Sequence, residues 1–276
     1  MEKQVFSGLT VNWHFTQACN MRCKYCFVSK CHEFCKADYD IILGKIKDKF
    51  ERVNFVGGEP TVSPYILELV KAAKSYGLKV TMVTNGYKMA KNPEFADELL
   101  KNLDGIGISI DSLSPETNTH IGRCHCNQTL TTTEYYELCK KIKSRGIPLK
   151  INTVVSRANI NEDFNKFYET VRPERIKMFQ VLVPNLPTKQ DFSDFLITKE
   201  EYDSFVEKHR KNGFKIVAED NAHMIGAYIM INSEGCFENN DAGIRSKSLV
   251  HPDVTIDSAF EEVHIDMTRY MYRYAA

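Results

Sequence analysis

Three cysteines, Cys19, Cys23 and Cys26, lie within eight residues of one another near the start of the chain. A segment this short can surround one metal ion or cluster only as a loop. Three thiolates leave one iron of a four-iron cluster without a protein ligand, and a catalytic metal site needs such an open position. A structural zinc site would close with a fourth ligand, which His14 or His32 could supply. The spacing favours a catalytic [4Fe–4S] cluster, with zinc as the alternative.

A second segment that could bind a ligand is Gly57-Gly58-Glu59-Pro60. Glycines allow the backbone to approach a ligand closely, and a carboxylate can accept hydrogen bonds from an ammonium group. Taken alone, these four residues would be a turn that carries a solvated acid. Its position, directly after the next strand-like run that follows the cysteines, favours a role in ligand binding.

Several apolar, β-branched runs are strand candidates, and each is followed by a polar segment of helical period. They cover residues 10–16, 52–57, 79–85, 105–111, 148–155 and 175–182. Alternation of strands and helices predicts parallel strands whose carboxyl ends meet at one rim, where such folds bind ligands. We therefore predict an α/β fold in which residues 1–182 form a partial (β/α)6 barrel. Residues 183–276 form a C-terminal extension that packs on the barrel and contributes to the substrate pocket.

The CxxxCxxC spacing, with Phe27 directly after it, and the GGEP segment together resemble the radical S-adenosylmethionine (SAM) superfamily. The resemblance implies that the cysteines hold a [4Fe–4S] cluster and that SAM binds its open iron. It also implies that the amino group of SAM is held at residues 57–59. The further residues expected to contact SAM, at its ribose and carboxylate, are Asn85, Ser109 and Arg123. The guanidinium of Arg123 suits a carboxylate because its donors form a fork.

Further motifs narrow the resemblance to the viperin family over about residues 11–235. They are Asn12-Trp-His-Phe-Thr16, Asn54-Phe55, Asn118-x-x-Ile-Gly-Arg123, Lys150-Ile-Asn152 and Arg175-x-Lys177-x-Phe179-Gln180. Members of that family dehydrate a nucleoside triphosphate to its 3′-deoxy-3′,4′-didehydro form, an antiviral chain terminator. The reaction begins when a 5′-deoxyadenosyl radical abstracts the C4′ hydrogen of the ribose. The resemblance implies CTP, UTP or GTP as the substrate and an external one-electron reductant.

Three cations on the fifth and sixth strand candidates, Lys150, Arg175 and Lys177, would gather at one side of the rim and suit a triphosphate. Lys150 alternates in phase with Asn152, so both can point into the barrel. The competing interpretation is that these are solvated charges at strand ends. The complete set of predicted substrate-binding residues is His14, Arg52, Asn54, Lys150, Asn152, Arg175 and Lys177.

Tyr228 resembles the family tyrosine placed near the reacting ribose, and we predict it as the catalytic residue. Its alternative is a core tyrosine with a bonded hydroxyl. His14 likewise has two interpretations, a contact with the substrate or packing in the core. Other residues depart from the family pattern: Val56 replaces a serine, and Cys124-His125-Cys126 replaces a stretch of glycine and lysine. These departures put some of the triphosphate contacts in doubt.

Charge and hydropathy limit the classes of partner. The 276 residues contain 36 Lys and Arg and 36 Asp and Glu, so no basic excess favours a nucleic-acid polymer or an anionic membrane. No stretch is apolar enough for a signal peptide or a membrane span, and the membrane helix and aromatic tail of animal viperins are missing. We expect a cytoplasmic enzyme related to microbial members of the family.

Several cysteines remain outside the cluster motif, and among them Cys31, Cys35, Cys124 and Cys126 could form a second site. Free thiols are the simpler interpretation. Two other functions stay open. The chain could be a radical SAM enzyme for another small substrate, such as a deazapurine precursor or a peptide, or it could be a non-catalytic iron–sulfur protein that senses nucleotides.

Overall fold

A computed structural model describes residues 8–26, 36–182, 192–210, 213–240 and 243–275. Its strands form one sheet in the order β10-β9-β8-β1-β2-β3-β4-β5-β6-β7. Strands β1 to β7 are parallel to their neighbours, β8 is parallel to β1, and β9 and β10 are antiparallel additions. The strands are β1 (Thr10–Thr16), β2 (Arg52–Gly57), β3 (Lys79–Thr84), β4 (Gly105–Ser109), β5 (Leu149–Val155), β6 (Arg175–Gln180), β7 (Ile216–Glu219), β8 (Met230–Ile231), β9 (Cys236–Glu238) and β10 (Arg245–Ser248).

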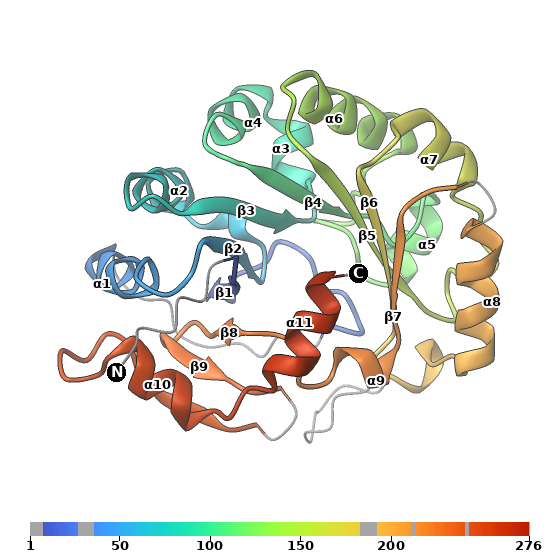
Figure 1. Ribbon diagram of the computed structural model, residues 1–276. Coiled ribbons are helices and arrows are strands. Elements are labelled where there is room, and N and C mark those ends of the chain that lie inside the picture. Colours follow the sequence, from blue (N-terminus) through green and yellow to red (C-terminus); the bar gives the residue numbers. More distant parts are fainter. Residues whose placement is uncertain (1–7, 27–35, 183–191, 211–212, 241–242, 276) are drawn as a thin grey trace.

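Helices follow most of the parallel strands and lie outside them, as Figure 1 shows for the arc from α1 to α8. The α-helices are α1 (Lys36–Ile46), α2 (Ile66–Ser75), α3 (Tyr87–Lys91), α4 (Pro93–Leu100), α5 (Pro115–His120), α6 (Thr132–Ser144), α7 (Asn165–Val171), α8 (Lys199–Arg210), α9 (Asn221–Met224), α10 (Ile256–Glu262) and α11 (Met267–Ala275). Two short 3₁₀ helices are η1 (Pro60–Val62) and η2 (Ser193–Phe195). The predicted α/β fold with six parallel strands is confirmed, and β7 adds a seventh strand that the sequence analysis missed.

Alternation along each parallel strand separates an apolar outer face from a polar inner face. On β1, Trp13 and Phe15 pack against Tyr39 of α1, with ring centroids 5.7 and 5.9 Å apart. Asn12 and His14, which alternate with these two residues along β1, therefore face the interior of the barrel. Barrels without an internal ligand usually fill this space with branched apolar side chains. A polar interior is the first structural sign that this barrel holds a polar molecule.

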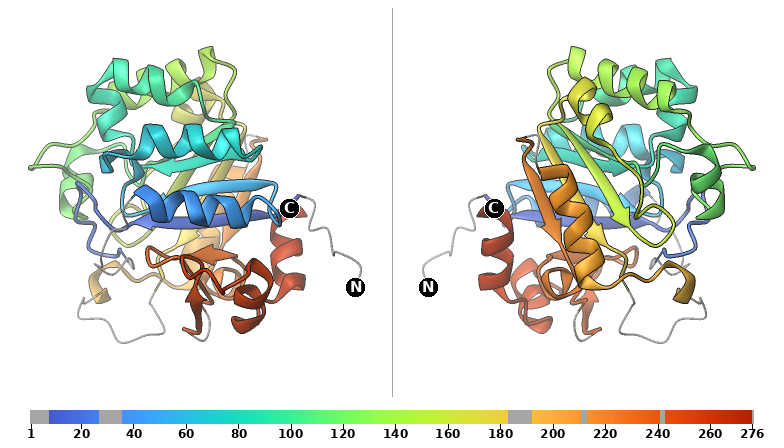
Figure 2. Two further views of the ribbon diagram at one scale, coloured as in Figure 1. Left: turned by 90° about the vertical axis from the view of Figure 1, so that its left-hand side faces the viewer. Right: turned by 90° about the vertical axis from the view of Figure 1, so that its right-hand side faces the viewer.

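The segment after residue 182 extends both edges of the sheet, through β7 on one side and β8 to β10 on the other. Figure 2 shows α10 and α11, in red, below the blue β1 and α1. Lys45 of α1 fastens this segment, because its Nζ donates hydrogen bonds to the backbone oxygens of Leu249, His251 and Val254 at 2.6–2.8 Å. Among the helices described, none has the length and apolar composition needed to cross a bilayer.

Tyr270 of α11 makes a second attachment. Its buried hydroxyl accepts a hydrogen bond from the backbone N–H of Thr10 at 2.6 Å and donates one to the backbone oxygen of Thr10 at 3.1 Å. These bonds join the C-terminal helix to the start of β1, the strand that leads into the cysteines. The last helix therefore supports the first strand.

We expect Tyr270→Phe to lower the free energy of unfolding by about 1–3 kcal/mol, because a buried backbone N–H loses its acceptor. Urea denaturation followed by circular dichroism measures the change. Tyr76→Phe is the control, since no hydrogen bond to its hydroxyl occurs among the described residues. Equal stability of the two variants would contradict the proposed role of α11.

Candidate active site

Residues 17–26, which we call the cysteine loop, connect β1 to the chain that precedes α1 and have no regular secondary structure. The GGEP turn holds the first part of this loop. The N–H of Gly58 donates to Thr16 O, and the N–H of Glu59 donates to Ala18 O, both at 2.8 Å. A Cβ atom on Gly58 would lie 2.2 Å from Ala18 O. Glycine is therefore needed here so that the turn can approach the cysteine loop.

A second turn, residues 121–123, holds the middle of the cysteine loop. The N–H of Arg22 donates to Gly122 O at 3.1 Å, and that of Lys24 donates to Ile121 O at 2.9 Å. Gly122 has φ +80°, and a Cβ atom on it would lie 2.2 Å from Arg22 O. This contact was not predicted, although the Ile-Gly-Arg sequence contains the glycine that permits it.

Asn85 and Ser109, predicted to contact SAM, follow and end β3 and β4 at the carboxyl rim, as expected. The side chain of Asn85 donates from Nδ2 to Oδ1 of Asn20 in the cysteine loop at 2.8 Å. His125 adds a contact between its Nδ1 and Asn20 O at 3.1 Å. The predicted SAM-binding rim and the cysteine loop are therefore in direct contact, and Asn85 contributes to both.

Arg123 is 8% exposed and forms a buried ion pair with Asp111, which is 1% exposed. Its Nε and Nη2 both donate to Asp111 Oδ2. The same oxygen accepts a hydrogen bond from the Tyr25 hydroxyl at 2.7 Å. Burial, and then the Asp111 carboxylate, raises the pKa of Tyr25 well above its usual value, so the hydroxyl remains a donor. Asp111, absent from the predicted site, thus links the cysteine loop to Arg123. The expected contact of Arg123 with SAM stays a prediction.

Glu59 is 1% exposed, and its carboxylate already has several donors. Oε1 accepts from the backbone and hydroxyl of Thr61 and from the hydroxyl of Thr84, and Oε2 accepts from the N–H of Asn85, all at 2.5–3.0 Å. Three of these donors meet Oε1 and one meets Oε2, so Oε2 keeps one acceptor position. Burial nevertheless raises the pKa of Glu59. The structure shows Glu59 as a link between η1 and the end of β3, and its contact with the SAM amino group remains a prediction.

The three motif cysteines carry free thiols; Cys19 and Cys23 are partly buried and Cys26 is exposed. Burial raises the pKa of Cys23 to about 11 and also raises that of Cys19. Such thiols ionise when a metal takes the place of their protons. Within the described ranges, no three Cys, His, Asp or Glu side chains are yet close enough to hold a metal ion. The donor set is right in kind for an iron–sulfur cluster, since one short loop provides three sulfur atoms.

His14 and His32 were the possible fourth ligands of a zinc site. His14 lies on β1 and faces the barrel interior, and burial lowers its pKa to about 4. His32 lies outside the described residues, as do Cys31 and Cys35. His14 is therefore a neutral residue of the barrel wall at neutral pH.

Strand register corrects the height of the predicted substrate cations. Arg52 and Arg175 are the first residues of β2 and β6, and Lys150 is the second of β5. They lie toward the amino ends of their strands, so the prediction that the cations gather at the rim was wrong. Alternation in a sequence gives the face of a strand on which a residue lies but not its height in the barrel. Lys150 is nevertheless paired with Arg175, and Asn152 with Lys177, as neighbours on one face.

Asn54 and the glycines of β4 shape the inner face of the barrel. Asn54 Nδ2 donates to Asn12 Oδ1 at 2.8 Å, and Asn54 Oδ1 accepts from the Thr81 hydroxyl at 2.9 Å. Gly107 lies beside the Lys150 side chain, whose Cε would be 2.8 Å from an added Cβ. A strand that reads Gly-Ile-Gly-Ile-Ser presents almost no side chain inward, which leaves room for the long lysine. The alternating glycines were a signal that the sequence analysis did not use.

Lys177 and Tyr228 both contact a residue that was not predicted, Glu219. Lys177 forms a buried ion pair with Glu219 Oε1, and the Tyr228 hydroxyl donates to Glu219 Oε2 at 2.5 Å. Glu219 ends β7, the strand missing from the predicted set. The sequence analysis therefore missed both the strand and the acid that joins two of its predicted site residues.

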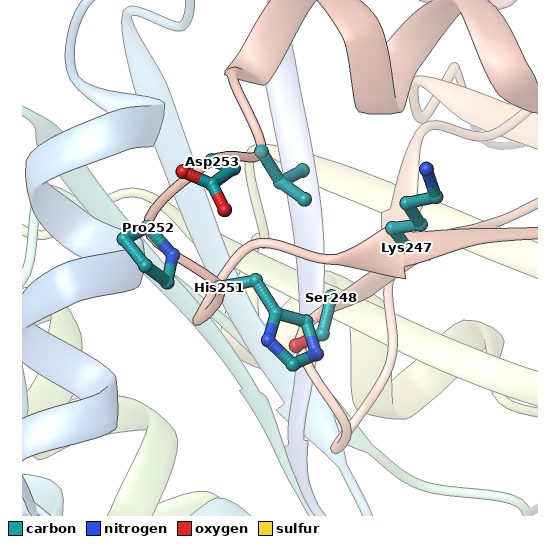
Figure 3. Close-up of a pocket in the computed structure, with 6 residues that line it drawn as sticks. Lys247, Ser248, His251, Pro252 and Asp253 are labelled. Atoms are coloured by element: carbon teal, nitrogen blue, oxygen red, sulfur yellow. The ribbon is translucent and has the colours of Figure 1, made fainter.

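A separate pocket of about 360 Å³ contains none of the predicted site residues (Figure 3). It lies between β10 and α10 and is lined by Lys247, Ser248, His251, Pro252, Asp253 and Val254. Its loop is the one whose carbonyl groups bind Lys45. The pocket therefore belongs to the attachment of the C-terminal segment.

Comparison with known proteins places these features in a family. The family model described as the radical SAM superfamily matches residues 13–171. An S-adenosylmethionine-dependent nucleotide dehydratase from Flammeovirga pacifica is 36% identical, over 96% of this chain and 93% of its own. A relative of the same name from Psychrobacter lutiphocae is 33% identical, over 96% and 94%.

Solved structures share the fold at low sequence identity. The structure named anSMEcpe with bound AdoMet and Kp18Cys peptide matches with a TM-score of 0.70 and 15% identity, over 96% of this chain and 82% of its own. Streptococcus suis SuiB bound to S-adenosylmethionine matches with a TM-score of 0.62 and 17% identity, over 95% and 66%. These likenesses support the fold alone.

We expect Gly58→Ala to reduce cluster loading several-fold, because the new Cβ would displace the backbone of the cysteine loop. Iron content and visible absorbance after anaerobic reconstitution measure the loading. Gly44→Ala in α1 is the matched control, since nothing lies within 4 Å of its added Cβ. Full loading of both variants would show that the close approach is unnecessary.

The lowered pKa of His14 predicts a pH dependence of stability. As the pH falls from 6.5 toward 4, the unfolded chain takes up a proton at His14 that the folded chain does not, so the free energy of unfolding decreases. Between pH 7 and pH 5 this loss should be about 2 kcal/mol. Urea denaturation should show it in the wild type and a smaller loss in His14→Gln. The same pH dependence in both proteins would contradict a neutral, buried His14.

Proposed function

Because the chain belongs to the radical SAM superfamily, and within it to the family of SAM-dependent nucleotide dehydratases, we propose that it dehydrates a nucleoside triphosphate at the ribose. The proposed product is the 3′-deoxy-3′,4′-didehydro nucleotide. The enzyme uses a [4Fe–4S] cluster and SAM, as its superfamily does. The nucleotide is the proposed substrate class, with CTP, UTP or GTP as the candidate bases.

The observation that carries this proposal is a pair of buried polar atoms on the inner face of the barrel. Arg52 Nε, a donor, and Asn152 Oδ1, an acceptor, have no hydrogen-bond partner among the described residues. Buried polar atoms are nearly always paired, and these two lie on the inner face of the barrel, so a ligand bound there would pair with them. Arg52 Nε suits a phosphate oxygen, and Asn152 Oδ1 suits a hydroxyl hydrogen of a ribose.

The positions of the cations inside the barrel indicate how the nucleotide is oriented along the barrel axis. Arg52, Lys150 and Arg175 supply cations toward the amino ends of the strands, where a triphosphate would neutralise them. The cysteines and the predicted SAM contacts lie at the carboxyl rim. We infer that the phosphates point toward the amino ends and that the ribose lies between them and the rim. This places the reacting sugar nearest to SAM.

The roles of the site residues follow from this arrangement. Cys19, Cys23 and Cys26 would hold the cluster, and the GGEP backbone, Asn85, Ser109 and Arg123 would hold SAM. Together, the bound cluster and SAM supply an acceptor for the hydrogen atom at C4′ of the ribose. The protein's part is to align the ribose, exclude water from the barrel and provide a proton for the departing 3′-hydroxyl. Tyr228 is the proposed catalytic residue for that last step.

A peptide or deazapurine substrate and a nucleotide sensor are weaker candidates. The relatives that match over nearly the whole chain are named nucleotide dehydratases. The structural neighbours with peptides are only 15–16% identical and so bear on the fold alone. The extra cysteines Cys124 and Cys126 form no disulfide with another described cysteine, and we propose that they are free thiols.

We further propose a cytoplasmic enzyme that receives electrons from an external one-electron reductant. Its partners would be the nucleotide and this reductant, with neither a nucleic-acid polymer nor a membrane. The balanced charge of the chain supports this, since nothing in its net charge attracts a polyanion.

An anaerobic assay with an equimolar mixture of the four ribonucleoside triphosphates tests the function. We expect one triphosphate to lose the mass of one water while 5′-deoxyadenosine accumulates. Cys23→Ala should abolish cluster absorbance and both products, because one thiolate ligand is lost. Cys236→Ala, which alters a buried cysteine outside the motif, should retain them. Release of 5′-deoxyadenosine without dehydration of any triphosphate would refute the proposed substrate class.

A further inference from the structure

Lys177, Glu219 and Tyr228 form a connected network inside the barrel. They come from the middle of β6, the end of β7 and the chain just before β8. Glu219 lies between the other two, with one carboxylate oxygen on the Lys177 ammonium and the other 2.5 Å from the Tyr228 hydroxyl. Since β7 is an edge of the sheet, the hydrogen bond to Tyr228 also connects that edge to the segment leading into β8.

The ion pair is almost fully buried, with side-chain exposures of 8% for Lys177 and 3% for Glu219. Burying two charges costs about as much free energy as their attraction returns, so stability alone does not account for such a pair. Most ion pairs of this protein are exposed, like Arg157–Glu201 with exposures of 49% and 33%. We therefore look for a functional role of the Lys177–Glu219 ion pair.

The pair also changes the role expected of Lys177. A carboxylate in contact with an ammonium largely cancels its charge as seen by a third group. Lys177 was predicted to bind the triphosphate, but Glu219 already neutralises it. Nucleotide binding should therefore depend less on Lys177 than on the cations nearer the amino ends of the strands, such as Arg52 and Arg175.

Glu219 fixes which of its partners carry protons. An ionised carboxylate only accepts hydrogen bonds, so the Tyr228 phenol must donate and the Lys177 nitrogen must present its N–H groups. The carboxylate thus holds two proton-bearing groups beside each other. A neutral glutamine in its place could still accept one hydrogen bond but would not stabilise the ammonium.

Strand register places this network at the height of the expected ribose. Ser109, predicted to contact SAM, pairs with Asn152 on β5, and Asn152 pairs with Lys177 on β6. Adjacent strands are about 4.8 Å apart, so Lys177 lies roughly 10 Å across the sheet from Ser109. The Arg175 cation lies two residues below Lys177, toward the amino end. Lys177 is therefore level with Asn152, the proposed ribose contact, and nearer the carboxyl rim than Arg175.

We propose that Glu219 is a positioning residue for the dehydration step, an inference that rests on the proposed function. It holds Lys177 and Tyr228 as a pair of acids beside the ribose. When the C3′–O bond of the C4′ radical breaks, the leaving hydroxyl takes one proton from this pair and departs as water. One electron from an external one-electron reductant completes the C3′=C4′ double bond. The pair then regains a proton from solvent.

The test counts two products in anaerobic single turnovers, 5′-deoxyadenosine and dehydrated nucleotide. In Glu219→Gln we expect 5′-deoxyadenosine to form at a rate near that of the wild type. The dehydrated nucleotide should fall at least about tenfold, because the acids are misaligned. Nucleotide affinity, measured by calorimetry on the reconstituted protein, should stay within about threefold or become tighter, because Lys177 is no longer neutralised.

Tyr228→Phe provides a second test that leaves the Lys177–Glu219 ion pair intact. It keeps the inference testable if Glu219→Gln does not fold. It should separate the two products in the same way. The double variant should lose no more dehydration than the stronger single variant, because both substitutions disable the same pair of proton donors. Glu201→Gln, which breaks the exposed pair with Arg157, is the matched control and should behave as the wild type. Circular dichroism melting verifies the fold of each variant.

Three results would overturn the inference: a parallel fall of both products, weaker nucleotide binding in Glu219→Gln, or unchanged dehydration. The first would mark Glu219 as a purely structural residue and the second as a binding residue. The wild type is read in the same assay. If it forms no dehydrated nucleotide, the proposed function fails with the inference, whereas a productive wild type with no separation in the variants removes only the role of Glu219.

Discussion

Gly58 and Gly122 allow two turns to come within hydrogen-bond distance of a loop that has no secondary structure of its own. That loop carries the three cysteines, so their positions depend on backbone contacts that any larger side chain at Gly58 or Gly122 would disrupt. Asp111 adds a buried attachment by accepting hydrogen bonds from both Tyr25 and Arg123. Residues at the carboxyl rim of the barrel thus hold the cysteine loop in its conformation. Several of the same rim residues are expected to bind SAM.

The barrel below the rim is shaped by a second constraint, the need to keep polar groups inside a parallel sheet. Its outer face is conventional, with aromatic residues of β1 packed under α1. Its inner face has amides paired with one another, cations near the amino ends and a buried acid at Glu219. Such an interior is costly without a ligand and favourable around an anionic one. The predicted cluster and SAM site at the rim and the proposed nucleotide site below it therefore lie at different heights in one barrel.

Much of this arrangement could be predicted from the sequence, because it depends on local patterns. Alternating runs gave the parallel strands almost to the residue, and the cysteine and GGEP spacings identified the loops that meet at the rim. Contacts between distant segments were missed. Glu219 lies in a four-residue strand too short to recognise, and Asp111 is defined by its partners rather than by a motif. The height of Arg52, Lys150 and Arg175 follows from strand register, which alternation does not give. At Glu59 the motif predicted a contact with a ligand, whereas the structure shows four hydrogen-bond donors from the protein itself.

The central claim is that the ribose of a nucleotide lies in the barrel with its C4′ hydrogen toward the SAM site. The most direct measurement uses the preferred triphosphate with deuterium at C4′ and records the mass of the 5′-deoxyadenosine released. The account predicts that one deuterium moves from the nucleotide into 5′-deoxyadenosine and that the dehydrated nucleotide has lost it. Unlabelled 5′-deoxyadenosine, with the deuterium retained in the nucleotide, would contradict it.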